Sequence, residues 1–116
     1  FAFLPPASVA AIFSMVTGWT VRHQELIEAG ERSWNIKRAF NVRCGVTARD
    51  DTLPRRLVSE PLANGGSKGQ IVELDKMLPQ YYALRGWTAN GIPTKEKLDS
   101  LGLHDVANDL AKYLTN

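Results

Sequence analysis

The chain has 116 residues, 44% of them hydrophobic and 22% charged, with a formal net charge of +2. This length suits one domain, and this composition excludes a disordered chain. The small net charge argues against binding to nucleic acid or an anionic membrane through overall charge. A single cysteine, Cys44, excludes an internal disulfide and a multi-cysteine metal site, and it favours a reducing compartment, the cytoplasm.

The apolar start of the chain, Phe1–Leu4, is interrupted by Pro5 and Pro6 and has no basic flank, so it is not a signal peptide. No apolar run approaches the ~20 residues of a membrane span. The first residue is not Met. We therefore expect the chain to be part of a larger protein.

The first predicted helix begins with Ser8 as its N-cap and ends at Gly18 as a left-handed C-cap. Apolar residues recur within it at the spacing of one buried helical face. These residues are Val9, Ile12, Phe13 and Val16.

The second predicted helix covers residues 21–42, with Thr20 as its cap. Gly30 in its middle costs about 1 kcal/mol relative to Ala, which predicts a close approach by another backbone. One side of this helix carries Leu26, Gly30, Ser33, Ile36 and Phe40, with Ile27 and Trp34 beside it.

A Gly-rich segment, 59–69, cannot form a regular element, and residues 71–72 suit a short extended piece. Three further helices follow. They are predicted from Leu74 or Asp75 to Arg85, from Thr94 as a cap to Leu101, and from Leu103 to Leu114. The prediction is thus an all-α, multihelical single domain over residues 1–116, with about five helices and an irregular Gly-rich link.

Four groups of residues could carry chemistry, and the first two are small sets of polar side chains. Cys44, His23 and His104 lack any metal-chelating or nucleophile–base spacing, so a structural reading is favoured. Asp50 and Asp51 could serve as an acid–base pair or a cation site. Adjacent aspartates in a turn more often accept backbone N–H bonds or face a neighbouring Arg49, which is the reading we favour.

Five arginines form a local basic patch, interleaved with acidic residues. Since Arg suits bidentate ion pairs, the patch favours an interface with another domain. The alternative is a free-standing helical module that binds nucleic acid through this connector. The arginines are Arg38, Arg43, Arg49, Arg55 and Arg56.

The aromatic cluster Tyr81, Tyr82 and Trp87 could form a ligand cage, but aromatics at helical spacing beside a Gly cap are more often core. No catalytic, cofactor-binding or metal-binding residue can be assigned from residue chemistry alone.

Three stretches together resemble the C-terminal region of the aldehyde ferredoxin oxidoreductase family of tungsten–pterin enzymes. The first comprises Glu31-Arg32, Asn35, Arg38–Arg43 and Gly45; the second is Asp50–Arg56 with the link through Lys68-Gly69. The third contains Glu73–Asp75, Met77-Leu78, Tyr81-Tyr82, Leu84–Trp87, Asn90–Thr94, Lys97-Leu98 and Leu101–Leu103. The likeness is strongest over residues 31–103.

The resemblance implies a C-terminal helical part of an enzyme that oxidises aldehydes to carboxylic acids. The full-length enzyme would hold tungsten, or molybdenum, on two molybdopterins together with a 4Fe-4S cluster, and would pass electrons to ferredoxin. This chain would supply packing, channel walls and interface, with the remaining domains as its partners and a homodimer left open. It would bind no cofactor itself. Cys44 stands where the family commonly has an acidic residue, so the resemblance gives it no role.

Overall fold

The computed structural model describes residues 4–114. Six α-helices and one short 3-10 helix make up the described chain, and no strand occurs within it. The helices are α1 Pro6–Thr17, α2 His23–Arg43, α3 Arg55–Ser59, α4 Leu74–Arg85, α5 Lys95–Ser100 and α6 His104–Leu114, with the 3-10 helix η1 at Ala48–Asp50. The all-α prediction is confirmed. The additional helix is α3, which forms in the connector where the sequence predicted none.

Several helix ends follow the predicted caps. Gly18 and Gly86 end α1 and α4 in the left-handed conformation, at φ 76° and 68°. The Thr94 hydroxyl accepts a hydrogen bond from the Lys97 amide at 3.2 Å and caps α5. These local signals were readable because each depends on residues within one turn.

The N-cap residues predicted for the first two helices were wrong. Helix α1 begins earlier than Ser8, because Pro6 at the first helical position has the required φ and no N–H to satisfy. Helix α2 begins after Arg22 rather than Thr20, because the Glu25 carboxylate accepts a hydrogen bond from the Arg22 amide at 2.7 Å. This reciprocal contact satisfies an amide that has no partner within the helix.

The expected faces of α1 and α2 are largely exposed. In α1, Ala10 is the buried residue, whereas Ile12 and Val16 are 51% and 80% exposed. In α2, Ile36 and Phe40 are exposed. The expected backbone contact at Gly30 is also wrong, since a Cβ there would meet nothing within 4 Å. The buried face of α2 is instead Asn35, Arg38, Ala39 and Val42.

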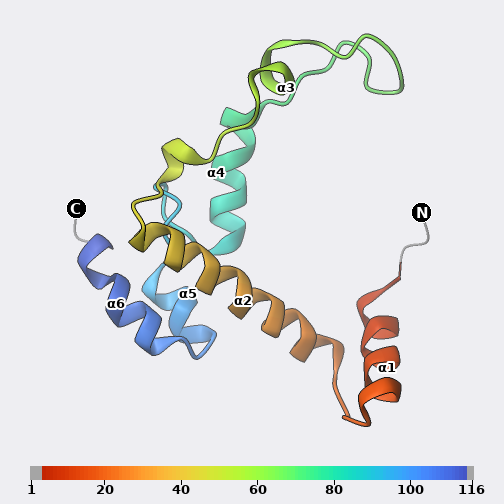
Figure 1. Ribbon diagram of the computed structural model, residues 1–116, viewed down its shortest axis with the longest axis vertical. Helices are drawn as coiled ribbons and strands as arrows, with labels where there is room; N and C mark the ends of the chain where they lie inside the picture. The colour runs from red at the N-terminus through yellow and green to blue at the C-terminus, as the bar shows by residue number, and fades with distance from the viewer. Residues whose placement is uncertain (1–3, 115–116) are drawn as a thin grey trace.

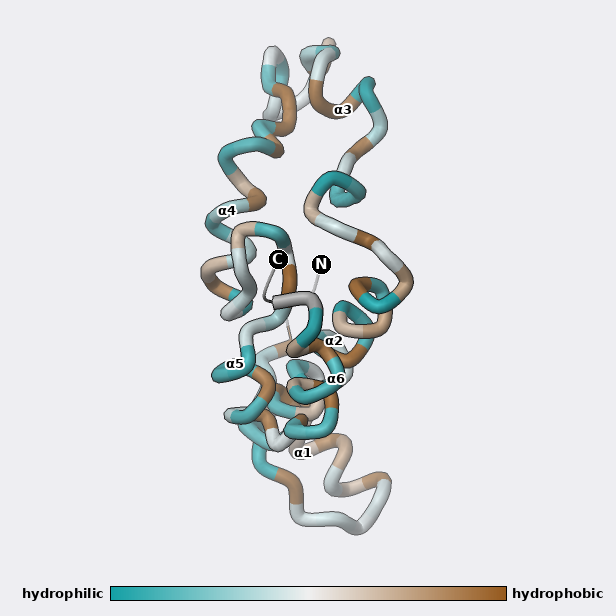
Figure 2. The backbone as a smooth tube through the Cα atoms, turned by 90° about the vertical axis from the view of Figure 1, so that its left-hand side faces the viewer, coloured by the Kyte–Doolittle hydropathy of each residue, from teal (hydrophilic) through white to brown (hydrophobic). Residues whose placement is uncertain are grey.

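The apolar core lies where α2, α5 and α6 meet. Its fully buried members are Leu98 of α5 and Leu110 of α6, packed against Ala39 and Val42 of α2 and Ala107 of α6. The core is therefore small and lies to one side of the molecule (Figure 1). Figure 2 shows hydrophobic positions spread along the whole chain rather than gathered at this centre.

The overall shape is open and flat. Helix α1 and the segment around α3 project to the same side of the chain, which gives it a C-shaped outline (Figure 1). The radius of gyration is 18.0 Å and the extents are 49 × 44 × 20 Å, whereas a compact domain of this length has a radius of about 13 Å. The accessible surface is 8776 Å², against about 6,300 Å² for a free-standing monomer of this mass. The excess is about 2,500 Å².

Candidate functional site

The centre of the molecule is a buried polar network that we call the Arg38 node: Asn35, Arg38, Asp51, Tyr82, Trp87 and Gly91. Arg38 is 7% exposed. Its guanidinium donates to both Asp51 carboxylate oxygens, Nη1 to Oδ1 at 2.7 Å and Nη2 to Oδ2 at 2.6 Å, while Nε donates to the Gly91 carbonyl at 2.7 Å. The same guanidinium lies 5.2 Å from the centre of the Trp87 ring. Three N–H groups and one face of this buried cation therefore have partners.

The Asp51 carboxylate also accepts a hydrogen bond from the Tyr82 hydroxyl. Burial alone would raise the pKa of Asp51. The hydrogen bonds from Arg38 and Tyr82, together with the Arg38 charge, nevertheless hold that pKa below its usual value. Burial, and then the hydrogen bond to Asp51 and its negative charge, raise the pKa of Tyr82 to about 12. At neutral pH the network therefore holds one cation, one anion and one neutral phenol.

Asn35 extends the node toward α2. It is fully buried, its side-chain oxygen accepts from the Trp87 indole N–H at 2.8 Å, and its amide donates to the Glu31 carbonyl at 2.9 Å. Glu31 in turn pairs with Lys97 at 2.9 Å and with Arg85. These contacts tie α2 to the end of α4 and to α5.

Gly91 is required by the node. Its φ is +71°, and a Cβ at this position would lie 2.2 Å from Arg38 Nη2 and 3.2 Å from Tyr82 Cζ. No side chain fits between the backbone and the guanidinium, and the left-handed conformation adds a further cost for any other residue.

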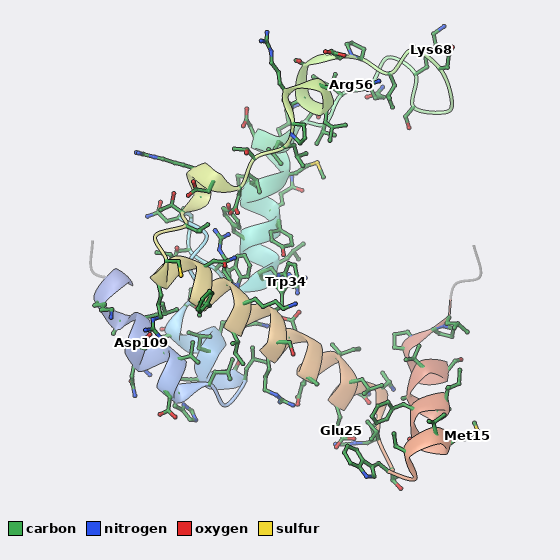
Figure 3. All side chains as sticks on the ribbon, in the orientation of Figure 1. Met15, Glu25, Trp34, Arg56, Lys68 and Asp109 are labelled. Atoms are coloured by element: carbon green, nitrogen blue, oxygen red, sulfur yellow. The ribbon has the colours of Figure 1, made fainter. Side chains whose placement is uncertain are left out.

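Beside the node, a cleft of about 420 Å³ lies between α2 and α4. Its walls include Trp34 and Lys37 of α2, Leu53 of the connector, and Leu74 and Leu78 of α4. We call it the α2–α4 cleft. Figure 3 places Trp34 in the angle between the two helices. The Trp34 indole donates to the Tyr81 hydroxyl at 2.7 Å, which links the two walls.

The two aspartates have structural partners. Asp50 accepts from the Thr47 amide at 2.7 Å, as expected for a turn. Asp51 faces Arg38 rather than Arg49. The aromatic prediction also agrees with the fold, since Tyr82 and Trp87 are buried.

The structure does not bring Cys44, His23 and His104 together. Cys44 is exposed, and the His104 ring nitrogen lies 2.8 Å from an Asp99 oxygen. Within the part of the chain that the structure describes, no group of three His, Cys, Asp or Glu side chains gathers to hold a metal ion. His23 begins α2, far along the chain from both.

The basic patch is divided. Arg38 is buried in the node, Arg43 pairs with Asp109 of α6 at 3.1 Å, and Arg56 lies 3.7 Å from Glu60. Within residues 4–114 the structure gives Arg49 and Arg55 no ion pair. Three of the five arginines therefore neutralise acidic groups of this chain, which weakens the case for nucleic-acid binding.

The role of Asn35 and Gly91 was missed from the residues alone. A signal existed: Asn35, Arg38 and Val42 recur at helical spacing on one face of α2. A polar residue on such a face is buried only when partners satisfy it, and these partners lie 52 and 53 residues away.

The hydrogen bonds of the Arg38 node join α2, the connector and α4. Among the described side chains, no buried nitrogen or oxygen lacks a hydrogen-bond partner. No helix within residues 4–114 is long and apolar enough to cross a bilayer. A satisfied polar centre, a small core and many exposed hydrophobic side chains are typical of a helical domain that packs against a partner.

Comparison with known proteins shows the family to which the chain belongs. The family described as "Aldehyde ferredoxin oxidoreductase, domains 2 & 3" matches residues 2–103. The tungsten-containing aldehyde ferredoxin oxidoreductase of Pyrococcus furiosus is 46% identical over 93 residues, which are 79% of this chain and 15% of that protein. The enzyme of the same name from Thermococcus kodakarensis is 45% identical over 87 residues, 74% of this chain and 14% of that protein. The chain belongs to the aldehyde ferredoxin oxidoreductase family, and it spans about a seventh of these curated relatives.

A solved structure, "Active site complex BamBC of Benzoyl Coenzyme A reductase in complex with 1,5 Dienoyl-CoA", is similar in fold. It has a TM-score of 0.73 and 27% identity, covering 96% of this chain and 16% of that chain. The three stretches that resembled the family contribute Asn35 and Arg38, Asp51, and Tyr82 to Gly91, so they meet in the Arg38 node. The alternative of a free-standing nucleic-acid-binding module receives no support from these relatives.

Proposed function

We propose that this chain works as part of a tungsten–pterin enzyme that oxidises an aldehyde to a carboxylic acid. The whole enzyme passes the two electrons through a 4Fe-4S cluster to ferredoxin and acts in the cytoplasm. Support comes from the two named relatives, each called a tungsten-containing aldehyde ferredoxin oxidoreductase. The observation that carries the proposal is the combination of that family match with about 2,500 Å² of excess surface.

We propose that this chain supplies no complete ligand set for the metal or the cluster, because no three His, Cys, Asp or Glu side chains gather among the described residues. Two of its carboxylates already have partners: Asp51 pairs with Arg38 and Tyr82, and Glu31 pairs with Arg85 and Lys97. We propose that other parts of the enzyme hold the cofactors. The tungsten–pterin group supplies the two-electron chemistry when bound.

The share of this chain, as one helical domain over residues 1–116, is to pack against the remaining domains. The Arg38 node fixes α2, α4 and the connector as a rigid frame, because bidentate, fully satisfied buried pairs hold one geometry. Rigid walls suit a region that borders a substrate channel and keeps water out of it. The exposed faces of α1 and α2 would be covered in the assembled enzyme.

A chimera tests this proposal. The 93 matching residues of the Pyrococcus furiosus relative are replaced by the corresponding residues of this chain, and the chimera is assayed for aldehyde oxidation with ferredoxin as acceptor. We expect a folded chimera within about tenfold of the parent rate, since the replaced region supplies no reacting group. A chimera that folds, carries tungsten and cluster, and yet lacks activity would overturn the proposal.

A further inference from the structure

The α2–α4 cleft has apolar walls that nothing in the described chain covers. Trp34 and Leu53 are 44% and 37% exposed, and Leu74 and Leu78 are half-buried beside them. A volume of about 420 Å³ lies within the range of about 300–1,000 Å³ for sites that receive a ligand or a partner side chain. The cleft is large enough to take more than one apolar side chain.

The cleft is preformed. Its inner wall includes Arg38, Asp51 and Tyr82 of the Arg38 node, whose polar groups bond one another across α2, the connector and α4. Because these bonds exist before anything enters, an occupant needs no rearrangement of the walls. Preorganisation of this kind lowers the cost of association.

The side chains that line the cleft carry a net positive charge, which comes from Lys37. Arg38 is neutralised by Asp51, whereas Lys37 is exposed and has no ion pair with another residue in the described range. An occupant that carries a carboxylate beside its apolar side chains therefore complements the cleft, and one with a cation at that place opposes it.

We infer that the α2–α4 cleft receives an amphipathic segment from another domain of the same oxidoreductase. The segment places apolar side chains between α2 and α4 and a carboxylate against Lys37. This inference rests on the proposed function. A second copy of the chain is the less suitable occupant, because a standard interface covers about 800 Å² per partner, well below the excess surface of about 2,500 Å².

The test uses this chain, carrying an affinity tag, co-expressed with the Pyrococcus furiosus polypeptide from which its 93 matching residues are deleted. Retention of that polypeptide on the tagged chain is quantified for wild type and for Leu78→Asp, Lys37→Glu and two matched controls. The controls are Leu84→Asp, on α4 but outside the cleft, and Lys68→Glu, in the Gly-rich link. Far-UV circular dichroism of each variant confirms that it is as helical as wild type.

The inference predicts at least a tenfold loss of retention for Leu78→Asp and at least a threefold loss for Lys37→Glu, with smaller losses for each control. A photo-crosslinker at position 78 should attach to a segment of the Pyrococcus polypeptide that carries Asp or Glu. Reversing that carboxylate to Lys should restore binding of the Lys37→Glu variant.

Two outcomes overturn the inference alone: retention that resists the cleft variants, or crosslinks to a second copy of the tagged chain. If wild type retains nothing, both the inference and the proposed packing role fail, whereas the chimera reports on the proposed function independently.

Discussion

Arg38 of α2 and Asp51 of the connector form a two-bonded ion pair, with N–O distances of 2.7 and 2.6 Å, in which the Arg38 side chain is 8% exposed. The pair joins segments that are 13 residues apart and sets the place of Tyr82 on α4 through a third hydrogen bond. The framework of the chain therefore depends on polar contacts as much as on its small apolar core.

Asp51→Asn should destabilise the chain by about 3 kcal/mol, because it leaves the Arg38 charge buried without its counter-ion. Urea unfolding followed by circular dichroism measures the change. The matched control is Glu60→Gln, which removes an exposed partner of Arg56 and should change the free energy of unfolding by less than about 0.5 kcal/mol. Equal effects of the two variants would contradict a structural role for the node.

The Asp51 contribution should depend on pH. Its pKa is lower in the folded chain than its usual 3.8, so the stabilisation is present above pH 3.8 and is lost as the pH falls through the folded value. The difference in unfolding free energy between wild type and Asp51→Asn should thus be full at pH 7 and shrink below pH 3.8. A difference that stays constant down to pH 2 would show that the carboxylate charge is irrelevant.

The Tyr82 hydroxyl should ionise at a higher pH than an ordinary tyrosine. Absorbance at 295 nm should show Tyr82 ionising near pH 12, and this step should vanish in Tyr82→Phe. Because the folded pKa lies above the ordinary 10.0, the stabilisation is complete below pH 10 and is lost as the pH rises toward 12. Tyr82→Phe should cost about 1 kcal/mol at pH 7. Titration of Tyr82 at pH 10 would be inconsistent with its bond to Asp51.

Gly91→Ala should destabilise the chain far more than Gly102→Ala. Both glycines have φ +71°, but a Cβ at Gly102 meets nothing within 4 Å, whereas one at Gly91 meets Arg38 at 2.2 Å. We expect about 1 kcal/mol for Gly102, from backbone strain alone, and about 3 kcal/mol or more for Gly91. Thermal unfolding of both variants gives the comparison, and similar melting temperatures would argue against close packing at Gly91.

The sequence predicted what local chemistry determines. Gly18, Gly86 and Thr94 end or begin helices because the required contacts lie within one turn. It did not predict that Asn35 and Arg38 occupy the buried face of α2 in place of Ile36 and Phe40, because the partners that make polar burial favourable are distant in sequence.

The same limit applies to α1. Its periodicity correctly indicated a helix with an apolar face, but periodicity does not say what covers that face. Ile12 and Val16 are exposed in this chain. Their exposure fits the expected interface with other domains. The helix was therefore predicted correctly, whereas the residues that it would bury within this chain were not.

Amide hydrogen exchange shows whether other domains cover the exposed face of α1. Exchange is followed for α1 in this chain alone and in a chimera in which residues 2–103 of this chain replace the corresponding region of the Pyrococcus furiosus relative. Because α1 buries only Ala10, its amides should exchange rapidly in the isolated chain and at least a hundredfold more slowly in the chimera. Equal exchange rates in the two settings would show that no other domain covers α1.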